Sequence, residues 1–390
     1  MTNLIARRVL TAAALTAAAS TAGLFALAGT SFAAPTAPQG VVQGTNATGA
    51  IKDHYVVVLN NDSDDAALVR KVGGTVDERY SSAVKGFSAT LTSTAAKRLA
   101  ADPAVAYVEQ DHTVQIASTP ASWGLDRIDQ PNLPLDHSYT AGSAASVHAY
   151  IIDTGIRMTH SQYAGRVTSG YDFVDHDTDA TDCQGHGTHV AGTVGGKTYG
   201  VAKDVQLVAV RVLDCSGNGS YSQIIAGVDW VTAHAVKPAV ANMSLGGAAG
   251  STLDDAVQKS IDSGVTYTVA AGNDSADACN QSPARLSAAI TVGATDSNDN
   301  AASFSNFGTC LDLYAPGVDI LSAGNSSDNG TETMSGTSMA SPHVAGAAAL
   351  YLETHPTATA QQVRDALVDA AASGKVTGAP AGSPNKLLQI

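Results

Sequence analysis

Short apolar segments and amphipathic segments alternate in two blocks of the chain. In the first block, residues 53–116, the pattern predicts strands over 54–59, 75–80, 84–91 and 105–109, and helices over 64–72 and 93–101. This order, strand–helix–strand–strand–helix–strand, is that of a small ferredoxin-like α+β domain. Domains of many functions share this element order, so it indicates a fold and no activity.

The second block begins near residue 147, and its strands are apolar throughout. We expect strands over 147–152, 206–210, 240–243, 266–270 and 289–292, and helices over 222–235, 252–263, 338–351 and 360–371. Apolar strands that alternate with helices predict an α/β fold, with a mostly parallel sheet covered by helices on both faces. In such sheets functional residues gather at the carboxyl ends of the strands.

The first 33 residues have the features of a secretory signal. An arginine pair precedes an apolar run over 9–28, and Ser31 and Ala33 supply small residues at the −3 and −1 positions of a cleavage site. A membrane anchor is the alternative, but the run is rich in Ala and Thr and that cleavage motif follows it. Residues 34–52, rich in Pro, Gly, Thr and Ala, are predicted to form a linker. We therefore expect an extracellular protein with no membrane association once the signal is removed.

Charge and cysteine content narrow the class of protein. The net charge is −14, and residues 117–390 hold 26 acidic and 12 basic side chains, whereas residues 1–116 hold 9 of each. Such a domain repels nucleic acid and anionic membranes, and its carboxylates either bind Ca²⁺ or only keep the domain soluble.

The four cysteines form no CxxC pair. In an oxidising compartment they predict two disulfides, for which three pairings are possible.

Three segments of the second block carry polar residues typical of catalysis. They are Ile151-Ile-Asp153-Thr-Gly155, with a carboxylate ending a buried strand; Gly185-His186-Gly-Thr-His189, with a histidine in a glycine turn that opens a helix; and Gly336-Thr-Ser338-Met-Ala-Ser-Pro342, with a serine at the start of another helix. Taken singly, each is explained by a helix cap or a turn. The two histidines also have the spacing of a metal-binding pair, but no third ligand follows at a familiar spacing.

Taken together, in the chain order Asp, His, Ser, these segments resemble the subtilisin-like serine proteases. Asn242-Met-Ser-Leu-Gly-Gly247, Ala270-Ala-Gly-Asn273 and Ser303-Phe-Ser-Asn306 place the resemblance nearest the proteinase K and aqualysin branch. The resemblance covers residues 118–390 and the segment before them.

The resemblance implies a serine endopeptidase made as a precursor. Residues 117–390 would form a subtilisin-like catalytic domain, and residues 53–116 would be an inhibitory propeptide that also assists folding. The tail of this propeptide would lie in the cleft like a cut product. The enzyme would remove it by self-cleavage near Ala117 or Ser118, and we expect the mature protein to be a monomer.

The chemistry of peptide hydrolysis explains the residue types. A serine hydroxyl is too weak an acid to attack a carbonyl unaided, so His186 would accept the proton of Ser338 and later deliver it to the leaving amine. Asp153 would fix the histidine tautomer and stabilise the imidazolium. The helix start at Ser338 aims backbone N–H groups at the developing oxyanion, and by resemblance the Asn273 side chain adds a second donor.

The resemblance also implies how substrate is held. Two segments would clamp a peptide between them as an added strand, through Gly217 and Asn218 on one side and Ser244, Leu245 and Gly246 on the other. Tyr221 would line a more distant subsite. Backbone hydrogen bonding makes few demands on sequence, so we expect broad specificity towards proteins and peptides. Large apolar or aromatic residues are expected before the cut bond.

Structural calcium is a further implication of the resemblance, as is the disulfide pairing Cys183–Cys215 and Cys279–Cys310. One calcium site would use the carbonyl oxygens of Ser287 and Ala289 with the Asp312 carboxylate. The second would use four side chains: Asp126, Asp129, Gln130 and Asp136. Ligands that are all oxygen suit Ca²⁺ and no catalytic transition metal. The alternative explanation for the acidic residues is helix capping and surface charge.

Two other classes of function share this fold or this chemistry with a protease. A catalytically silent binding protein with this fold would be expected to lack a triad residue or the oxyanion asparagine, and none is missing here. An esterase would use the same acyl chemistry, but the chain has no G-x-S-x-G nucleophile motif.

Overall fold

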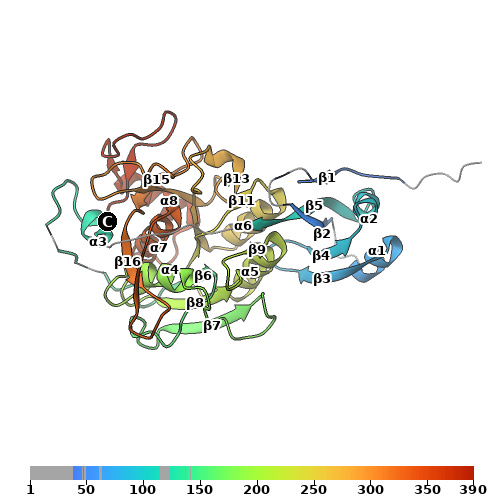
Figure 1. The fold of residues 1–390 in the computed structure, drawn as a ribbon, viewed down its shortest axis with the longest axis horizontal. Coiled ribbons are helices and arrows are strands. Elements are labelled where there is room, and N and C mark those ends of the chain that lie inside the picture. Colours follow the sequence, from blue (N-terminus) through green and yellow to red (C-terminus); the bar gives the residue numbers. More distant parts are fainter. Residues whose placement is uncertain are drawn as a thin grey trace, which may run out of the picture. The chain divides into compact units, whose positions relative to one another are not determined.

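The computed structural model describes residues 38–45, 47, 50–60, 64–114, 123–136, 138–140 and 142–390. The expected signal segment and the expected cleavage bond near Ala117 lie outside the described residues. Within the described part, two domains are each built around a sheet of their own (Figure 1).

The N-terminal domain has the predicted strand and helix order. Its elements are β1 (Val42–Gln43), β2 (Ala50–Leu59), α1 (Asp65–Val72), β3 (Gly74–Tyr80), β4 (Gly86–Leu91), α2 (Ser93–Leu99) and β5 (Val105–Val114). The strands lie side by side in the order β1-β5-β2-β4-β3, and β2 is antiparallel to both β4 and β5. Side chains such as Val57, Phe87 and Val108 form the core beneath the two helices.

The expected linker is partly a component of this sheet. Residues 50–52 belong to β2, and Val42 and Gln43 pair in parallel with β5. The boundary between linker and domain is therefore earlier than residue 53. Linker composition misleads here because a two-residue strand is held by its partner strand and carries almost no pattern of its own.

The second domain is an α/β fold, as predicted. Its elements are α3 (Gly124–Ile128), β6 (His148–Asp153), β7 (Val167–Asp172), α4 (His186–Gly195), β8 (Gln206–Arg211), β9 (Gly219–Ser220), α5 (Tyr221–His234), β10 (Ala239–Met243), β11 (Gly247–Ala248), α6 (Ser251–Asp262), β12 (Thr266–Ala270), a 3₁₀ turn (Ala278–Asn280), β13 (Gln281–Ser282), β14 (Ile290–Thr295), β15 (Leu313–Pro316), β16 (Ile320–Ala323), β17 (Thr331–Met334), α7 (Thr337–Thr354), α8 (Ala360–Ala370), β18 (Ala372–Ser373) and β19 (Lys386–Leu387).

The main sheet of this domain has nine strands in the order β18-β19-β15-β14-β12-β10-β6-β8-β7. The pairs from β7 across to β15 are all parallel. Side chains of β6 alternate between the two faces: Ile151 packs in the core with α4 and α7, whereas Tyr150 and Ile152 pack in the core with α5 and α6. Burial on both faces explains why these strands are apolar throughout.

The two domains meet at the helices α5 and α6 (Figure 1). Val56, Tyr80, Ala83 and Val84 of the N-terminal domain belong to the same buried cluster as the side chains of α5 and α6. The outer surface of these helices is thus covered by the first domain.

Both predicted disulfides, Cys183–Cys215 and Cys279–Cys310, are present. Of the described part of the chain, no helix combines the length and apolar character needed to cross a lipid bilayer.

Candidate active site

Asp153 is the last residue of β6, at the carboxyl edge of the main sheet. The chain leaves β6 towards β7 and β8 on one side, and later returns to β10 on the other. A reversal of strand order of this kind is the usual place for a site in such sheets. The Asp153 side chain is fully buried, and its Oδ1 accepts the N–H of Thr154 at 2.8 Å.

His186 begins helix α4 and is also fully buried. Its Nδ1 lies 2.8 Å from Asp153 Oδ1. The close approach of the two chain segments depends on Gly187, because a Cβ there would lie 2.1 Å from the carbonyl oxygen of Gly155. The histidine is thereby held with one ring nitrogen on a carboxylate and with Nε2 free of hydrogen-bond partners among the described residues.

Asp182 shapes the turn before His186 and was missed by the sequence analysis. It accepts the N–H groups of Gly185 and Thr188, and also the hydroxyl of Thr154, the residue after Asp153. A capping residue normally stands directly before the helix, and Gly185 is there, so Asp182 has no capping signal in the sequence.

Ser338 lies in the first turn of α7 and is 2 % exposed. Its Oγ donates to the carbonyl oxygen of Ser244 at 3.1 Å. A serine at this position has the N–H groups and the positive end of the helix dipole beside it.

Asn273 follows β12 in a loop that passes close to the start of α7. Its Oδ1 accepts the N–H of Thr337 at 2.8 Å and the Thr337 hydroxyl at 3.1 Å. The loop is held from beneath by Asn306, which binds Ala271 O, Asp274 N and Ala276 N. Since the Asn273 oxygen is engaged, its amide nitrogen is the end left to donate to a ligand.

The expected substrate segments lie on two sides of β5 of the N-terminal domain. Gly217 and Asn218 form a turn closed by Asp214, whose N–H donates to Asn218 O. The next two residues form β9, which pairs antiparallel with Thr113 and Val114 at the end of β5. On the other side β11 lies against β5, just after Ser244, Leu245 and Gly246. A strand of the chain itself therefore occupies the edge where a substrate strand is expected.

Tyr221, expected to line a distant subsite, is the first residue of α5 and is 1 % exposed. Its ring faces His112 of the N-terminal domain, with ring centroids 5.1 Å apart. Burial raises the pKa of the Tyr221 hydroxyl well above its usual range, and that hydroxyl donates to Ala248 O.

Carboxylates bind the two domains together at helix starts. Glu109 of β5 accepts the N–H groups of Ser251 and Thr252 at the start of α6. Asp111 accepts the N–H and hydroxyl of Ser222 at the start of α5. Burial raises the pKa of both carboxyls, and the helix N-termini and hydrogen bonds offset the cost of burying their charge.

The remaining buried histidines of this region are packed. His189 Nε2 lies 2.9 Å from Ile320 O, and His343 Nδ1 lies 2.8 Å from Met339 O. Burial lowers the pKa of His189 to about 3 and that of His343 to about 4. Both are therefore neutral at neutral pH, and neither has contacts that suggest a metal ligand.

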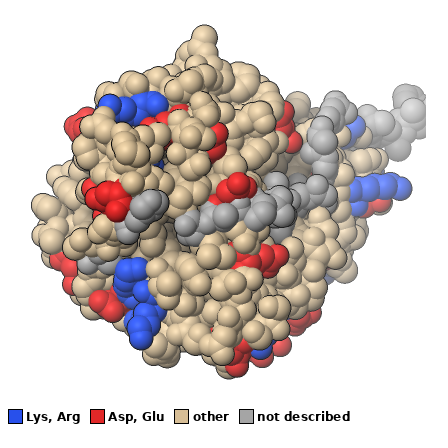
Figure 2. Space-filling model, turned by 60° about the vertical axis from the view of Figure 1, so that its left-hand side comes forward, with Lys and Arg blue, Asp and Glu red and all other residues tan. Residues whose placement is uncertain are grey.

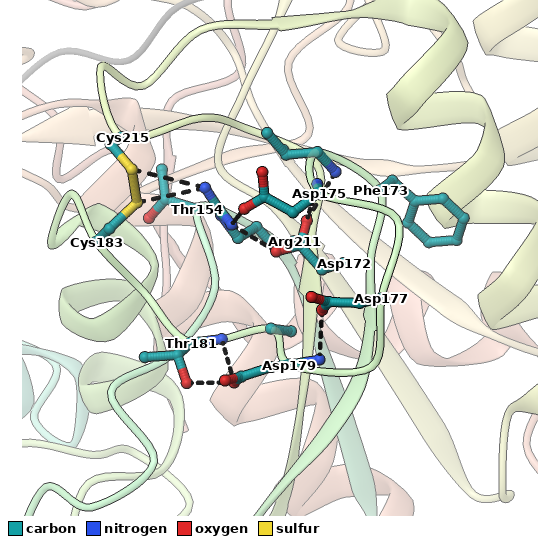
Figure 3. A network of polar contacts seen from close by, with 12 residues as sticks. Thr154, Asp172, Phe173, Asp175, Asp177, Asp179, Thr181, Cys183, Arg211 and Cys215 are labelled. Atoms are coloured by element: carbon teal, nitrogen blue, oxygen red, sulfur yellow. Dashed lines mark hydrogen bonds and ion pairs between the residues drawn. A yellow bond between two sulfur atoms is a disulfide. The ribbon is translucent and has the colours of Figure 1, made fainter. Parts of the chain in front are cut away.

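Arg211 lies against the disulfide between Cys183 and Cys215 (Figure 3). It ends β8, pairs with Asp172 and Asp175, and its Nη2 lies 3.4 Å from the sulfur of Cys183 and 3.6 Å from that of Cys215. Cys183 precedes His186 by three residues, and Cys215 precedes the turn at Gly217. The disulfide thus joins the loop before His186 to the segment that is expected to bind substrate.

The two expected calcium clusters differ in their contacts. Asp312 is already paired with Arg364 through Oδ1, and its Oδ2 accepts Thr291 N. A cation there would share the Asp312 carboxylate with Arg364, so the cluster with Ser287 and Ala289 offers Ca²⁺ a carboxylate whose charge is already paired.

Oxygen atoms converge in the second cluster. The Asp136 N–H donates to Asp126 Oδ1 at 3.3 Å and to Gln130 Oε1 at 3.0 Å. The pKa of the Asp129 carboxyl is raised by burial and then by the charges of Asp136 and Asp126. Among the described residues, however, no three acidic, His or Cys side chains are already arranged around a metal position. The donor set fits Ca²⁺ only when Gln130 and backbone oxygens contribute.

The fold and this site define a class of protein, the subtilisin-like serine endopeptidases. A Subtilase family model matches residues 146–386, and a peptidase inhibitor I9 model matches residues 47–117. The chain therefore belongs to the Subtilase family, with an inhibitor-type propeptide before the catalytic domain.

Individual relatives agree with this membership. An extracellular serine proteinase of Thermus sp. (strain Rt41A) is 56 % identical over 319 residues, which are 81 % of this chain and 78 % of the relative. Alkaline serine exoprotease A of Vibrio alginolyticus is 54 % identical over 363 residues, 87 % of this chain and 67 % of the relative. The crystal structure of a cold adapted subtilisin-like serine proteinase matches with a TM-score of 0.67 and 56 % identity, covering 70 % of this chain and 98 % of that chain.

Proposed function

We propose that the chain is exported as a precursor, cuts itself after the propeptide, and then hydrolyses proteins with broad specificity as a monomer outside the cell. One observation carries this proposal: a buried aspartate–histidine pair lies beside a substrate edge that the propeptide strand β5 occupies. The face in Figure 2 is mostly uncharged, with acidic side chains in small scattered groups and basic ones in a few places, so it offers no continuous basic surface for nucleic acid.

In this mechanism the Ser338 hydroxyl turns from Ser244 O towards His186 Nε2, which has no other described partner. His186 takes the proton as Ser338 Oγ attacks the peptide carbonyl, and Asp153 holds Nδ1 protonated. The N–H of Ser338 and the Asn273 amide stabilise the oxyanion. His186 then gives its proton to the leaving amine, and water releases the acyl group by the reverse steps.

The subsites follow from the same edge. A substrate strand would take the place of β5 beside β9 and β11, with backbone bonds to the segments at Gly217–Asn218 and Ser244–Gly246. Glycines in both segments leave room for a large apolar or aromatic side chain before the cut bond.

The test is irreversible labelling with a serine-directed fluorophosphonate together with casein hydrolysis by the secreted product. We expect one adduct, on Ser338, and loss of casein hydrolysis in step with labelling. N-terminal sequencing of the same product would locate the maturation site. A product that hydrolyses casein without forming an adduct would contradict the proposal.

Inhibition by the propeptide is expected to depend on the two interface carboxylates. Added to mature enzyme as a separate protein, residues 38–117 should inhibit, and Glu109→Gln should raise the inhibition constant about 10- to 100-fold, because a charged acceptor for two helix N–H groups is lost. Asp77→Asn is the control, since the described contacts of Asp77 are with Thr90 and His54, both in the same domain. Equal inhibition by the Glu109 and Asp77 variants would disprove the role of the carboxylate.

Calcium bound at the second cluster would join Asp126, Asp129, Gln130 and Asp136, and its contribution would be structural. Excess Ca²⁺ should lengthen the half-life of the mature enzyme during heating relative to chelator, since a ligand at 100 times its Kd stabilises the native state by about 2.7 kcal/mol.

The variants separate the two clusters. Asp129→Asn should remove most of the calcium effect, whereas Asp312→Asn should shorten the half-life equally with and without calcium, because it breaks only the pair with Arg364. Half-lives that do not respond to calcium in the wild-type enzyme would exclude the site.

A further inference from the structure

A proline stands inside the helix that carries Ser338. In an α-helix the carbonyl of residue i accepts the N–H of residue i+4. For Ser338 that residue is Pro342, in the interior of α7. Proline has no N–H, and its ring crowds the carbonyl four residues earlier. The backbone carbonyl of the proposed nucleophile therefore lacks the donor that its own helix would supply.

A hydroxyl from the end of β10 fills this gap. Ser244 Oγ donates to Ser338 O at 2.7 Å, while Ser338 Oγ donates to Ser244 O at 3.1 Å. Each serine thus bonds the backbone of the other, and both are buried. The carbonyl that Pro342 deprives of a partner is satisfied from another element.

Asn242 sets the direction of the Ser244 hydroxyl. A serine hydroxyl has one hydrogen and can point it at any acceptor, whereas an amide nitrogen can only donate. Asn242 Nδ2 donates to Ser244 Oγ at 2.9 Å, so the hydrogen of Ser244 is left for Ser338 O.

Asn242 is itself fixed from its other end. Its Oδ1 accepts the hydroxyls of Thr268 on β12 at 3.0 Å and of Ser341 on α7 at 2.7 Å. Asn242, Thr268 and Ser341 are all at most 1 % exposed. Buried polar groups cannot exchange their partners for water, so breaking any of these hydrogen bonds is costly. A fully paired network of this kind therefore has a single arrangement.

We propose that the side chains of Asn242 and Ser244 are positioning residues for the nucleophile. They replace the helical hydrogen bond that Pro342 removes, and so hold the first turn of α7 at the orientation from which Ser338 Oγ attacks. In this role Ser244 acts through its hydroxyl, separately from the backbone contact with substrate proposed above. The inference rests on Ser338 being the nucleophile.

The test is a double-mutant cycle between Ser244→Ala and Pro342→Ala, with kcat and KM measured on a peptide nitroanilide. Alanine at 342 restores an N–H donor to Ser338 O. Ser244→Ala should lower kcat about tenfold with KM changed less than twofold, and in the Pro342→Ala background its effect should fall below about threefold. Variants that mature slowly can be processed in trans by immobilised wild-type enzyme.

Asn242 is tested in the same way. Asn242→Asp keeps the shape but cannot donate when ionised, so it should lower kcat as Ser244→Ala does and add less than threefold when the two are combined. Asn242→Ala serves where the buried carboxylate prevents folding. Multiplicative losses in the combined variant would show that the two side chains act independently, against the proposal.

A matched control separates positioning from general stability. Ser260 is a buried serine of α6 whose hydroxyl bonds Tyr267, and Ser260→Ala should lower thermal stability while leaving kcat unchanged in both backgrounds. An equal cost of Ser244→Ala in the presence and absence of Pro342 would overturn the inference. A fluorophosphonate adduct on a serine other than 338 would instead overturn the proposed nucleophile.

Discussion

The Ser338→Ala variant is expected to accumulate as an uncut precursor that does not hydrolyse casein. An alanine methyl group has no proton to give to His186 and cannot form the acyl-enzyme, and the loss of kcat is about 10⁶-fold, the magnitude known for removing the triad serine of a subtilisin. Burial of the site keeps water from replacing the hydroxyl efficiently. Gel analysis of the secreted product and casein hydrolysis measure the two effects.

A nearby serine provides the control. Ser335 precedes the nucleophile by three residues and its Oγ accepts the N–H of Asp319. Ser335→Ala should mature and hydrolyse casein as the wild type does. Maturation of the Ser338→Ala protein in a host that lacks other extracellular proteases would show that another group makes the cut.

The second large effect is expected for Asp153→Asn. Asp153 Oδ1 accepts both the Thr154 N–H and the proton on His186 Nδ1. An asparagine can keep both contacts through its oxygen but carries no charge, so the imidazolium that forms when His186 takes the proton loses its counter-charge. The amide nitrogen would take the place of Oδ2, which has no hydrogen-bond partner in the described contacts. The cost is about 10⁴-fold in kcat, as for the same change in a serine protease of unrelated fold.

This variant should fold, which makes the comparison with a second buried aspartate informative. Asp299 pairs with the buried Arg127 away from the triad. Asp299→Asn should lower the free energy of unfolding but leave kcat per folded molecule unchanged, whereas Asp153→Asn should do the reverse. Thermal melts and active-site titration distinguish the two. Comparable kcat values for both variants would remove Asp153 from the mechanism.

The sequence was most informative where burial is complete. The predicted ends of the strands β6, β8, β10, β12 and β14 differ from the observed ends by at most three residues, because both faces of these strands are buried and their side chains are apolar. The half-buried β7 and the short strands β15, β16 and β17 were not predicted. β15 is fully buried, but its four residues, which end in a proline, are too few to give a strand pattern. β1 was taken for linker for the same reason: its structure comes from β5.

In the site, too, some residues could be predicted from the sequence and others could not. Asp153, His186, Ser338 and Asn273 were predicted as site residues because each stands in a local motif. The structure places His186 against Asp153 and Ser338 against Ser244. Asp182, Asn242 and Thr268 were not assigned a role, because their partners are distant in sequence and a buried polar residue carries no signal of its direction. The ion pair of Asp312 with Arg364, 52 residues away, likewise has no signal in the sequence, and it pairs the charge of a carboxylate expected to bind calcium.

The edge at β9, which the propeptide strand β5 occupies, affects how activity develops in a population of molecules. In the proposed function propeptide and substrate need the same backbone partners, so occupancy by one excludes the other, and the apparent KM should rise linearly with the concentration of free propeptide. A mature molecule that digests released propeptide lowers this competitor for every other molecule present. Activity after export should therefore follow a lag and then an accelerating rise, and the lag should shorten when a trace of mature enzyme is added at the start.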